Sequence, residues 1–198
     1  MLILASESPR RRELLQQLKI PFTVQSARVC ELEQPPAGCS VSVLPEMNAQ
    51  LKAAAVSVLH PEARVIGADT AIVFADRLIG KPRDPEDARR ILRLLSGHTH
   101  EVITGITVMR GGKNPFRYSW SEVSRVTFKP LDEQTIGAYL SLVHVLDKAG
   151  AYAVQEHGDM IISEISGDMN NIIGLPLEKL HRVLTAAASE DIPVFADI

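Results

Sequence analysis

The stretch from residue 65 to residue 82 constrains the fold of this 198-residue chain more than any other segment. It contains two apolar, strand-like runs, the first interrupted by Asp69 and the second ending at Gly80-Lys81-Pro82. A buried carboxylate without a partner is costly or becomes neutral. We therefore expect Asp69 and Lys81 to lie at the ends of two paired strands and to form a charged site on a rigid frame. The alternative is an aspartate that caps a turn at a strand end.

Composition excludes several classes of protein. Hydrophobic residues make up 45% of the chain, which is enough for a sizeable core. The net charge of -3 indicates no general affinity for nucleic acid or for an anionic membrane. The sequence shows no signal peptide and no apolar run of membrane-spanning length, so we expect a cytoplasmic protein.

Two cysteines, Cys30 and Cys39, fall in what the sequence predicts to be one loop. A disulfide between them stays open, but two cysteines make no disulfide framework, and free thiols are favoured. They are poor candidates for a metal site because no cluster of His or Cys completes a ligand set.

Strand-like and helical segments alternate along the chain. The expected strands lie within residues 2–5, 22–25, 65–82, 102–109, 118–128 and 160–165. The expected helices begin at Ser8-Pro9, Pro45, Asp84, Asp132 and Pro176, with loops at 26–41 and between 165 and 176. Several strand pairs must be antiparallel, which predicts an α/β fold with a mixed central sheet flanked by helices. We expect residues 1–198 to form one domain, with two merged lobes around a cleft and a C-terminal tail at 185–198.

The segment Ser6-Glu7-Ser8-Pro9-Arg10-Arg11-Arg12 places three arginines at the start of a helix. A helix N-terminus already carries partial positive charge and unpaired N–H donors, so arginines there are unfavourable unless an anion joins them. The helix at Asp84 carries acids in its first turn instead. This contrast indicates a phosphate site beside Arg11. The alternative is that the arginines extend into solvent or pair with Glu7 and Glu13.

Other polar residues have both a functional and an ordinary interpretation. Lys52 lies on an otherwise apolar helix, where its stem could simply cover the helix flank. Lys81, held between a glycine and a proline, is a better phosphate ligand. Asp147-Lys148 fits a surface turn pair, and Gln155 fits either a solvated side chain or an amide that binds a base edge. The sequence contains no Walker-type glycine loop and no nucleophile elbow.

A series of short motifs follows one another along the chain: Ala5-Ser6-Glu7-Ser8-Pro9-Arg10-Arg11, Lys52-Ala53, Gly67-Ala68-Asp69-Thr70, Gly80-Lys81-Pro82, Thr104-Gly105, Asp147-Lys148-Ala149-Gly150-Ala151-Tyr152, Gln155 and Gly174-Leu175-Pro176-Leu177. In this order they resemble the Maf family of nucleotide pyrophosphatases, from residue 2 to about residue 184. The resemblance implies a mixed sheet with a deep cleft, similar to the inosine triphosphate pyrophosphatases. It also implies hydrolysis of a nucleoside triphosphate to the monophosphate and pyrophosphate with a divalent cation, by a homodimer.

The resemblance also implies roles for individual residues. Asp69 matches the catalytic acid, described as a proton acceptor. The expected substrate-binding residues are Ser8, Arg11, Lys52, Lys81 and Lys148. Selectivity is expected from Arg10, Thr70 and Gln155, which resemble the branch acting on dTTP and UTP. Glu31 and Asp69 are the expected metal ligands.

The chain departs from the family pattern in two places. The usually acid-rich stretch before Glu31 contains Arg28, so Glu33 stays open as an alternative ligand. Residues 167–171 replace a stretch that usually holds small and aromatic residues. The mechanism that we expect is attack of water on the α-phosphorus, with Asp69 orienting or deprotonating the water. The alternatives are a catalytically weak nucleotide-binding regulator of cell division, a partner-binding protein, and a phosphatase that releases orthophosphate.

Overall fold

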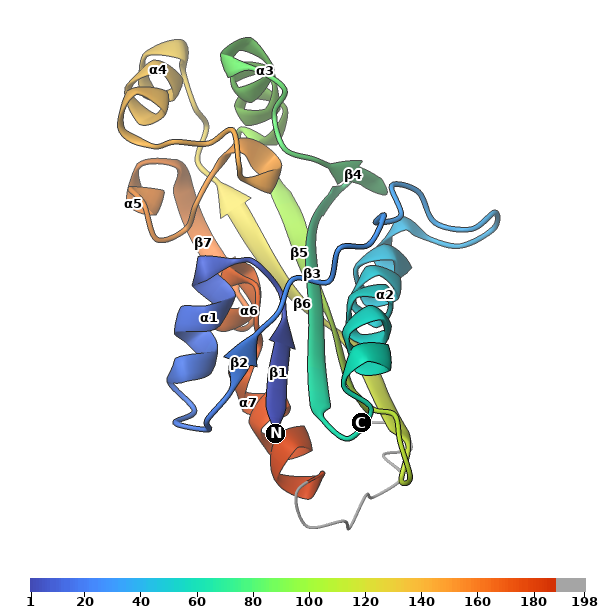
Figure 1. Ribbon diagram of the computed structural model, residues 1–198. Helices are drawn as coiled ribbons and strands as arrows, with labels where there is room; N and C mark the ends of the chain where they lie inside the picture. The colour runs from blue at the N-terminus through green and yellow to red at the C-terminus, as the bar shows by residue number, and fades with distance from the viewer. Residues whose placement is uncertain (188–198) are drawn as a thin grey trace.

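The computed structural model describes residues 1–187 and shows one mixed sheet with helices on both of its faces (Figure 1). The strands are β1 (Leu2–Ala5), β2 (Thr23–Val24), β3 (Arg64–Phe74), β4 (Arg77–Ile79), β5 (Thr99–Arg110), β6 (Phe116–Phe128) and β7 (Ile162–Ser166). Their order is β2-β1-β3-β5-β6-β7, and β4 pairs with β3 beside this path. β1 is parallel to β2 and β3, and the other pairs are antiparallel. The expected mixed α/β fold is confirmed.

Five of the seven helices within the described residues begin close to the residues that the sequence predicted. They are α1 (Pro9–Gln16), α2 (Leu44–Leu59), α3 (Pro85–Leu95), α4 (Glu133–Leu142), α5 (Gly158–Ile161), α6 (Met169–Ile173) and α7 (Leu177–Ala186), with short 3-10 turns η1 (Val41–Val43) and η2 (Ala149–Ala151). The hydroxyl or carboxylate of Ser8, Asp84 and Asp132 accepts a backbone N–H at the start of α1, α3 and α4. These side chains satisfy one of the unpaired donors of each helix.

Three local expectations were wrong. The strand expected at 160–165 begins only at Ile162, because the residues before it form α5. The segment between residues 165 and 176 was expected as a loop, but it contains α6, which Asp168 caps. Asp69 was expected at a strand end, but β3 continues past it to Phe74. The chain then reverses through Ala75 and Asp76, both with positive φ, and returns as β4.

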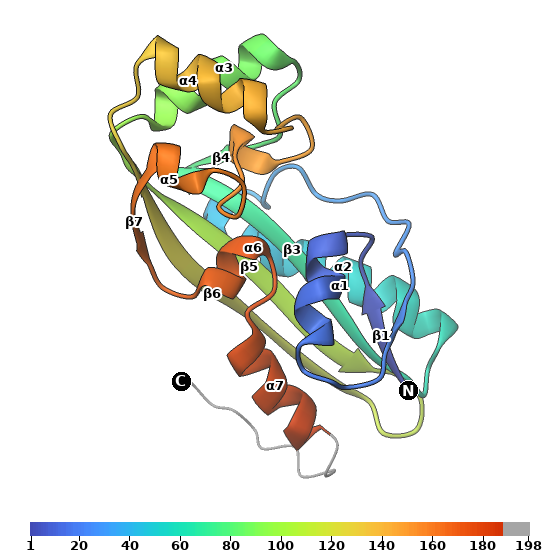
Figure 2. The same ribbon diagram turned by 90° about the vertical axis from the view of Figure 1, so that its left-hand side faces the viewer.

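Besides a smaller cluster that contains Ala53 and Val65, the long strands join two hydrophobic clusters. One surrounds Phe128 and Tyr139 and is covered by α3 and α4. The other contains Ile66 and Ile106 and is covered by α1 and α7. Figure 2 shows these helix pairs at opposite ends of the sheet. The cleft described below lies between them.

The expected boundary between the last helix and the C-terminal tail lies further along the chain than predicted. Residues 185 and 186, expected in the tail, belong to this helix, while residues 188–198 lie outside the described part. Within residues 1–187, the helices are too short or too polar to cross a membrane.

Candidate active site

A cavity of about 530 Å³ lies between the two hydrophobic clusters. The residues that the sequence singled out come from the start of α1, the loop before α2, α2 itself, β3, the segment after β4, and the segment around η2. All of them line this one cavity: Ser8, Arg10, Arg11, Glu31, Lys52, Asp69, Thr70, Lys81, Lys148 and Gln155. The structure therefore brings the whole predicted set together.

Asp69 lies where β3 has one unpaired edge. On that side β3 pairs with β1 as far as Gly67 and with β4 only from Ile72 onward. Between these pairings the strand borders the cavity. On its other edge Asp69 is paired with Gly105 of β5. A carboxylate can thus lie in the middle of a strand and still reach the cavity.

Two glycines bring helix α2 down onto Asp69. A Cβ at Gly67 would overlap the carbonyl of Ala49, and a Cβ at Gly105 would overlap the backbone of Glu46. Side chains alternate along a strand, so Gly67 and Asp69 face the same side, toward α2. The missing Cβ atoms allow α2 to lie close enough for its side chains to reach the carboxylate.

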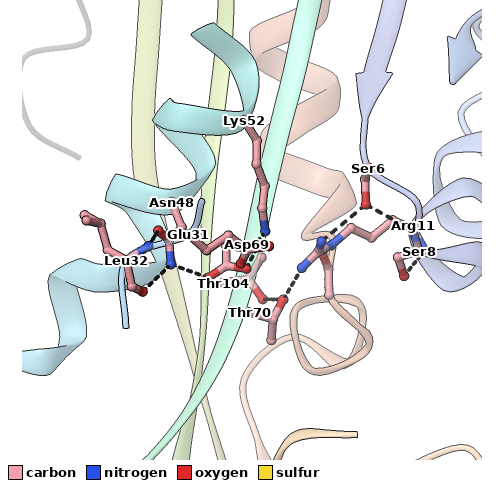
Figure 3. A network of polar contacts seen from close by, with 11 residues as sticks. Ser6, Ser8, Arg11, Glu31, Leu32, Asn48, Lys52, Asp69, Thr70 and Thr104 are labelled. Carbon is pink, nitrogen blue, oxygen red and sulfur yellow. Dashed lines mark hydrogen bonds and ion pairs between the residues drawn. The ribbon is translucent and has the colours of Figure 1, made fainter. Parts of the chain in front are cut away.

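Lys52 joins the two carboxylates that were expected to bind a metal (Figure 3). Its ammonium lies 2.8 Å from Asp69 Oδ1 and 2.9 Å from Glu31 Oε2. Only 9% of Lys52 is exposed, which makes a lysine stem lying along the helix surface the wrong interpretation. The side chain instead offsets part of the negative charge on the acidic side of the cavity.

Asn48 belongs to the same network, and sequence reasoning missed it. It lies one turn before Lys52 on α2, and it is 3% exposed. Its Nδ2 donates to Asp69 Oδ2 at 3.3 Å and to the carbonyl of Leu32 at 3.1 Å, while its Oδ1 accepts the Leu32 N–H at 2.8 Å. The available signal was an amide four residues before Lys52 on an otherwise apolar helix face.

Thr70 begins a hydrogen-bond chain on the opposite face of the sheet. Its hydroxyl accepts from Arg11 Nη2 at 3.0 Å and lies 2.9 Å from the hydroxyl of Thr104, its partner across the β3–β5 ladder. Thr104 donates to the carbonyl of Asn171 in α6 at 2.9 Å. Because each hydroxyl has one proton, Thr70 donates to Thr104, and the chain has one consistent direction.

Arg11 is fixed by three acceptors from separate segments. In addition to Thr70, its Nε donates to the carbonyl of Gly174 at 2.9 Å and its Nη1 to Ser6 Oγ at 3.3 Å. Burial lowers the pKa of the guanidinium, and the charges of Asp69 and Glu31 act in the opposite direction. A guanidinium has five N–H donors, so one N–H on each Nη is left to bind an anion in the cavity.

Lys81 and Lys148 differ in their surroundings. Lys81 is exposed, and within residues 1–187 its ammonium has no ion pair. Lys148 is 7% exposed, so the interpretation of a surface turn pair was wrong. Its ammonium donates to the carbonyl of His144, lies 3.0 Å from Asp147 Oδ1 and lies 3.5 Å from Glu156 Oε1. Gln155 is exposed at the cavity rim.

Comparison with known proteins agrees with this geometry. The model of the family described as Maf-like protein matches residues 1–187. The chain belongs to the Maf family. A dTTP/UTP pyrophosphatase of Akkermansia muciniphila is 46% identical over 184 residues, which cover 92% of this chain and 94% of that protein. A dTTP/UTP pyrophosphatase of Pelotomaculum thermopropionicum is 43% identical over 183 residues, with 92% and 94% covered.

A solved structure supports the fold alone. The HAM1 protein of Coxiella burnetii is 16% identical, with a TM-score of 0.54 over 93% of this Maf chain and 98% of its own chain. The resemblance and the fold inferred from the sequence are both confirmed.

The opposite charges of the Maf cavity are nearly equal in number but unevenly paired, with five cations and four carboxylates in its lining. Lys52 is paired with Glu31 and Asp69, and Lys148 with Asp147 and Glu156. Three further cations line the walls without an ion pair among the described residues: Arg10, Arg11 and Lys81. The part of the cavity wall that carries these three cations therefore fits a polyanion, while the carboxylates are concentrated around the two paired lysines.

The carboxylates of the Maf cavity fit a divalent cation that a phosphate helps to hold. Within residues 1–187, three or more His, Cys, Asp or Glu side chains are nowhere grouped as metal ligands. However, Glu31 and Asp69 converge on the same point, the Lys52 ammonium. Mg²⁺ is commonly held by one or two carboxylates together with substrate phosphates. Glu33 also lines the cavity, whereas Arg28 lies outside it.

Proposed function

We propose that this Maf protein is a nucleoside triphosphate pyrophosphatase that hydrolyses dTTP, UTP or similar nucleotides, canonical or modified, to the monophosphate and pyrophosphate. The observation that carries the proposal is a single cavity in which Asp69 and Glu31 share one ammonium while three other cations are unpaired among the described residues. A triphosphate supplies the negative charge that those cations lack. The names of the two bacterial relatives support the substrate class. Its role would be to remove unwanted nucleotides from the cellular pool.

The triphosphate would bind between the start of α1 and the segment after β4. Arg11 is held by its three acceptors with N–H donors left for phosphate oxygens, and Ser8 lies at the helix N-terminus that favours an anion. Lys81 reaches the cavity from the other side. Together these groups would stabilise the negative charge that develops on the leaving pyrophosphate.

Asp69 would act on the attacking water. The water oxygen forms a bond to the α-phosphorus, the bond from the α-phosphorus to the bridging oxygen breaks, and Asp69 accepts the water proton. Lys52 and Asn48 hold the two carboxylate oxygens of Asp69 in a fixed orientation. Carboxylate lone pairs of Glu31 and Asp69 that Lys52 and Asn48 leave unused would hold a divalent cation, which would neutralise charge on the phosphate oxygens.

Selectivity for the base would involve Arg10, Thr70 and Gln155. Gln155 is exposed at the rim. Its side-chain amide can present either its oxygen acceptor or its nitrogen donor to a base edge. Thr70 acts differently, because its hydroxyl holds Arg11 and Thr104. Its effect on selectivity would therefore pass through the position of Arg11.

The test is a panel of canonical and modified nucleoside triphosphates with Mg²⁺ or Mn²⁺, analysed for both pyrophosphate and orthophosphate. The proposal requires pyrophosphate, with dTTP and UTP among the best substrates. Release of orthophosphate would identify a phosphatase, and binding without turnover would identify a nucleotide-binding regulator. The homodimer and the cytoplasmic location stay predictions, and the former is tested by light scattering.

A further inference from the structure

The loop that carries Glu31 and Glu33 is held in place by few contacts. Residues 26–40 contain no helix or strand, and Glu31, Leu32 and Glu33 are all exposed. Among the described residues, the side-chain hydrogen bonds that tie residues 26–39 to other elements run from Leu32 to Asn48. The Glu31–Lys52 ion pair is the other polar link. Apolar burial therefore contributes little to holding this loop over the cavity, and these polar contacts must hold it there.

Asn48 holds the loop through both the oxygen and the nitrogen of its side-chain amide. The oxygen accepts the N–H of Leu32, and the nitrogen donates to the carbonyl of the same residue. The second proton of the nitrogen goes to Asp69 Oδ2. An amide buried in an apolar helix face is costly unless it is satisfied, and here every observed partner belongs to the site.

We propose that Asn48 is a positioning residue that holds the Glu31–Glu33 segment against Asp69 and so assembles the carboxylate side of the cavity. Leu32 is fixed through its backbone, and both of its acidic neighbours line the cavity. This inference rests on the proposed function, because it assigns the carboxylates to the nucleotide and its divalent cation. It concerns how those carboxylates are placed and adds no chemical step.

The test compares Asn48→Leu and Asn48→Ala with a matched control, Gln50→Leu. Leucine keeps the branched shape of Asn48 in a larger side chain but removes all three hydrogen bonds, and alanine removes them without added volume. Gln50 lies on the same helix and donates to Glu46, so its loss leaves the cavity intact. Residues that orient metal ligands typically change affinity or activity by about 10- to 100-fold when replaced. We expect a loss of that size for both Asn48 variants in Mn²⁺ affinity, measured by electron paramagnetic resonance with a saturating non-hydrolysable dTTP analogue, and in kcat/KM at low Mn²⁺.

A second measurement follows the loop without any turnover. Trypsin cleaves after arginine, and Arg28 is exposed in the loop. Cleavage at Arg28 should be several times faster in both Asn48 variants than in the wild type and in Gln50→Leu, with unchanged far-UV circular dichroism. A cleavage rate like that of the wild type, or unchanged Mn²⁺ affinity, overturns the proposal. A wild type that binds Mn²⁺ but releases no pyrophosphate contradicts the proposed function instead. In that case the Mn²⁺ affinity and the rate of trypsin cleavage still decide the role of Asn48.

Discussion

Asp69 and Thr70 are consecutive residues of β3, yet their side chains belong to networks on opposite faces of the sheet. Asp69 contacts Lys52 and Asn48 of α2, whereas Thr70 contacts Arg11 of α1 and Thr104 of β5. The alternation of side chains along a strand produces this division. One face of the sheet thus supplies the Asp69 carboxylate, and the other face fixes the Arg11 guanidinium.

Replacing Asp69 by asparagine should abolish most turnover and leave the fold intact. Asparagine keeps the shape of the side chain but cannot accept the proton of the attacking water. The expected loss in kcat is about 10²- to 10⁴-fold, the usual contribution of a positioned base. Steady-state pyrophosphate release measures it, with the thermal unfolding midpoint as control. Turnover within a few fold of the wild type would remove Asp69 from its proposed role.

Replacing Thr104 by valine should weaken substrate binding through Thr70 and Arg11. The change leaves the Thr70 hydroxyl and the Asn171 carbonyl without their partner at a fully buried position. The loss of stability should be about 1–3 kcal/mol, as for other unsatisfied buried groups. KM for the nucleotide should also rise, because the Thr70 hydroxyl, one of the three acceptors of Arg11, is then free to rotate.

A valine at Thr107 is the matched control for this prediction. Thr107 is equally buried in β5 but bonds to Ser119, outside the cavity. This variant should lose stability without a rise in KM. Equal KM values in the two variants would show that the Thr70–Thr104 contact does not affect substrate binding.

Replacing Gln155 by glutamate should change the ranking of bases more than the rate with the best substrate. A glutamate keeps an acceptor oxygen but loses the amide donor, so only contacts to the base should change. The measurement is kcat/KM across the four common ribonucleotides and deoxyribonucleotides. An unchanged ranking would show that Gln155 does not contact the base.

His100 should make the protein less stable as the pH falls from about 6.5 to 4. Burial lowers the pKa of this histidine from 6.5 to about 4, and its Nε2 lies 2.8 Å from the Tyr152 hydroxyl. Between these values the unfolded chain binds a proton that the folded chain does not, so acid favours unfolding. The shift corresponds to about 3 kcal/mol of unfolding free energy.

The pH effect of His100 is measured by urea unfolding from pH 7 to pH 4. Carboxylates also titrate in this range, so the wild type is compared with His100→Gln. The variant should show a shallower decline between pH 6.5 and pH 4. Parallel curves would assign the acid sensitivity to other groups.

Local pattern predicted most of the fold. Helix starts at Ser8, Asp84 and Asp132 followed from capping chemistry, which acts over three or four residues. The segment after Gly167 was different, because its asparagines are typical of turns. Asp168 caps a five-residue helix there, and the buried Asn171 anchors it to β5 and β6.

The site was predictable as a set of residues but not as an arrangement. The unpaired edge beside Asp69 depends on where β1 ends and β4 begins, which no pattern within β3 reveals. Asn48 was missed for a related reason. Two of its three hydrogen bonds join backbone atoms of Leu32, and backbone partners leave no trace in the side chains of the sequence.

Hydrolysis of dTTP in oxygen-18 water tests the central claim most directly. Attack on the α-phosphorus, with Asp69 accepting the proton, places the heavy oxygen in dTMP and leaves pyrophosphate unlabelled. Mass spectrometry of the two products, for the wild type at saturating Mg²⁺ or Mn²⁺, gives the result. Heavy oxygen in pyrophosphate or in orthophosphate would mean attack at another phosphorus and would contradict the account.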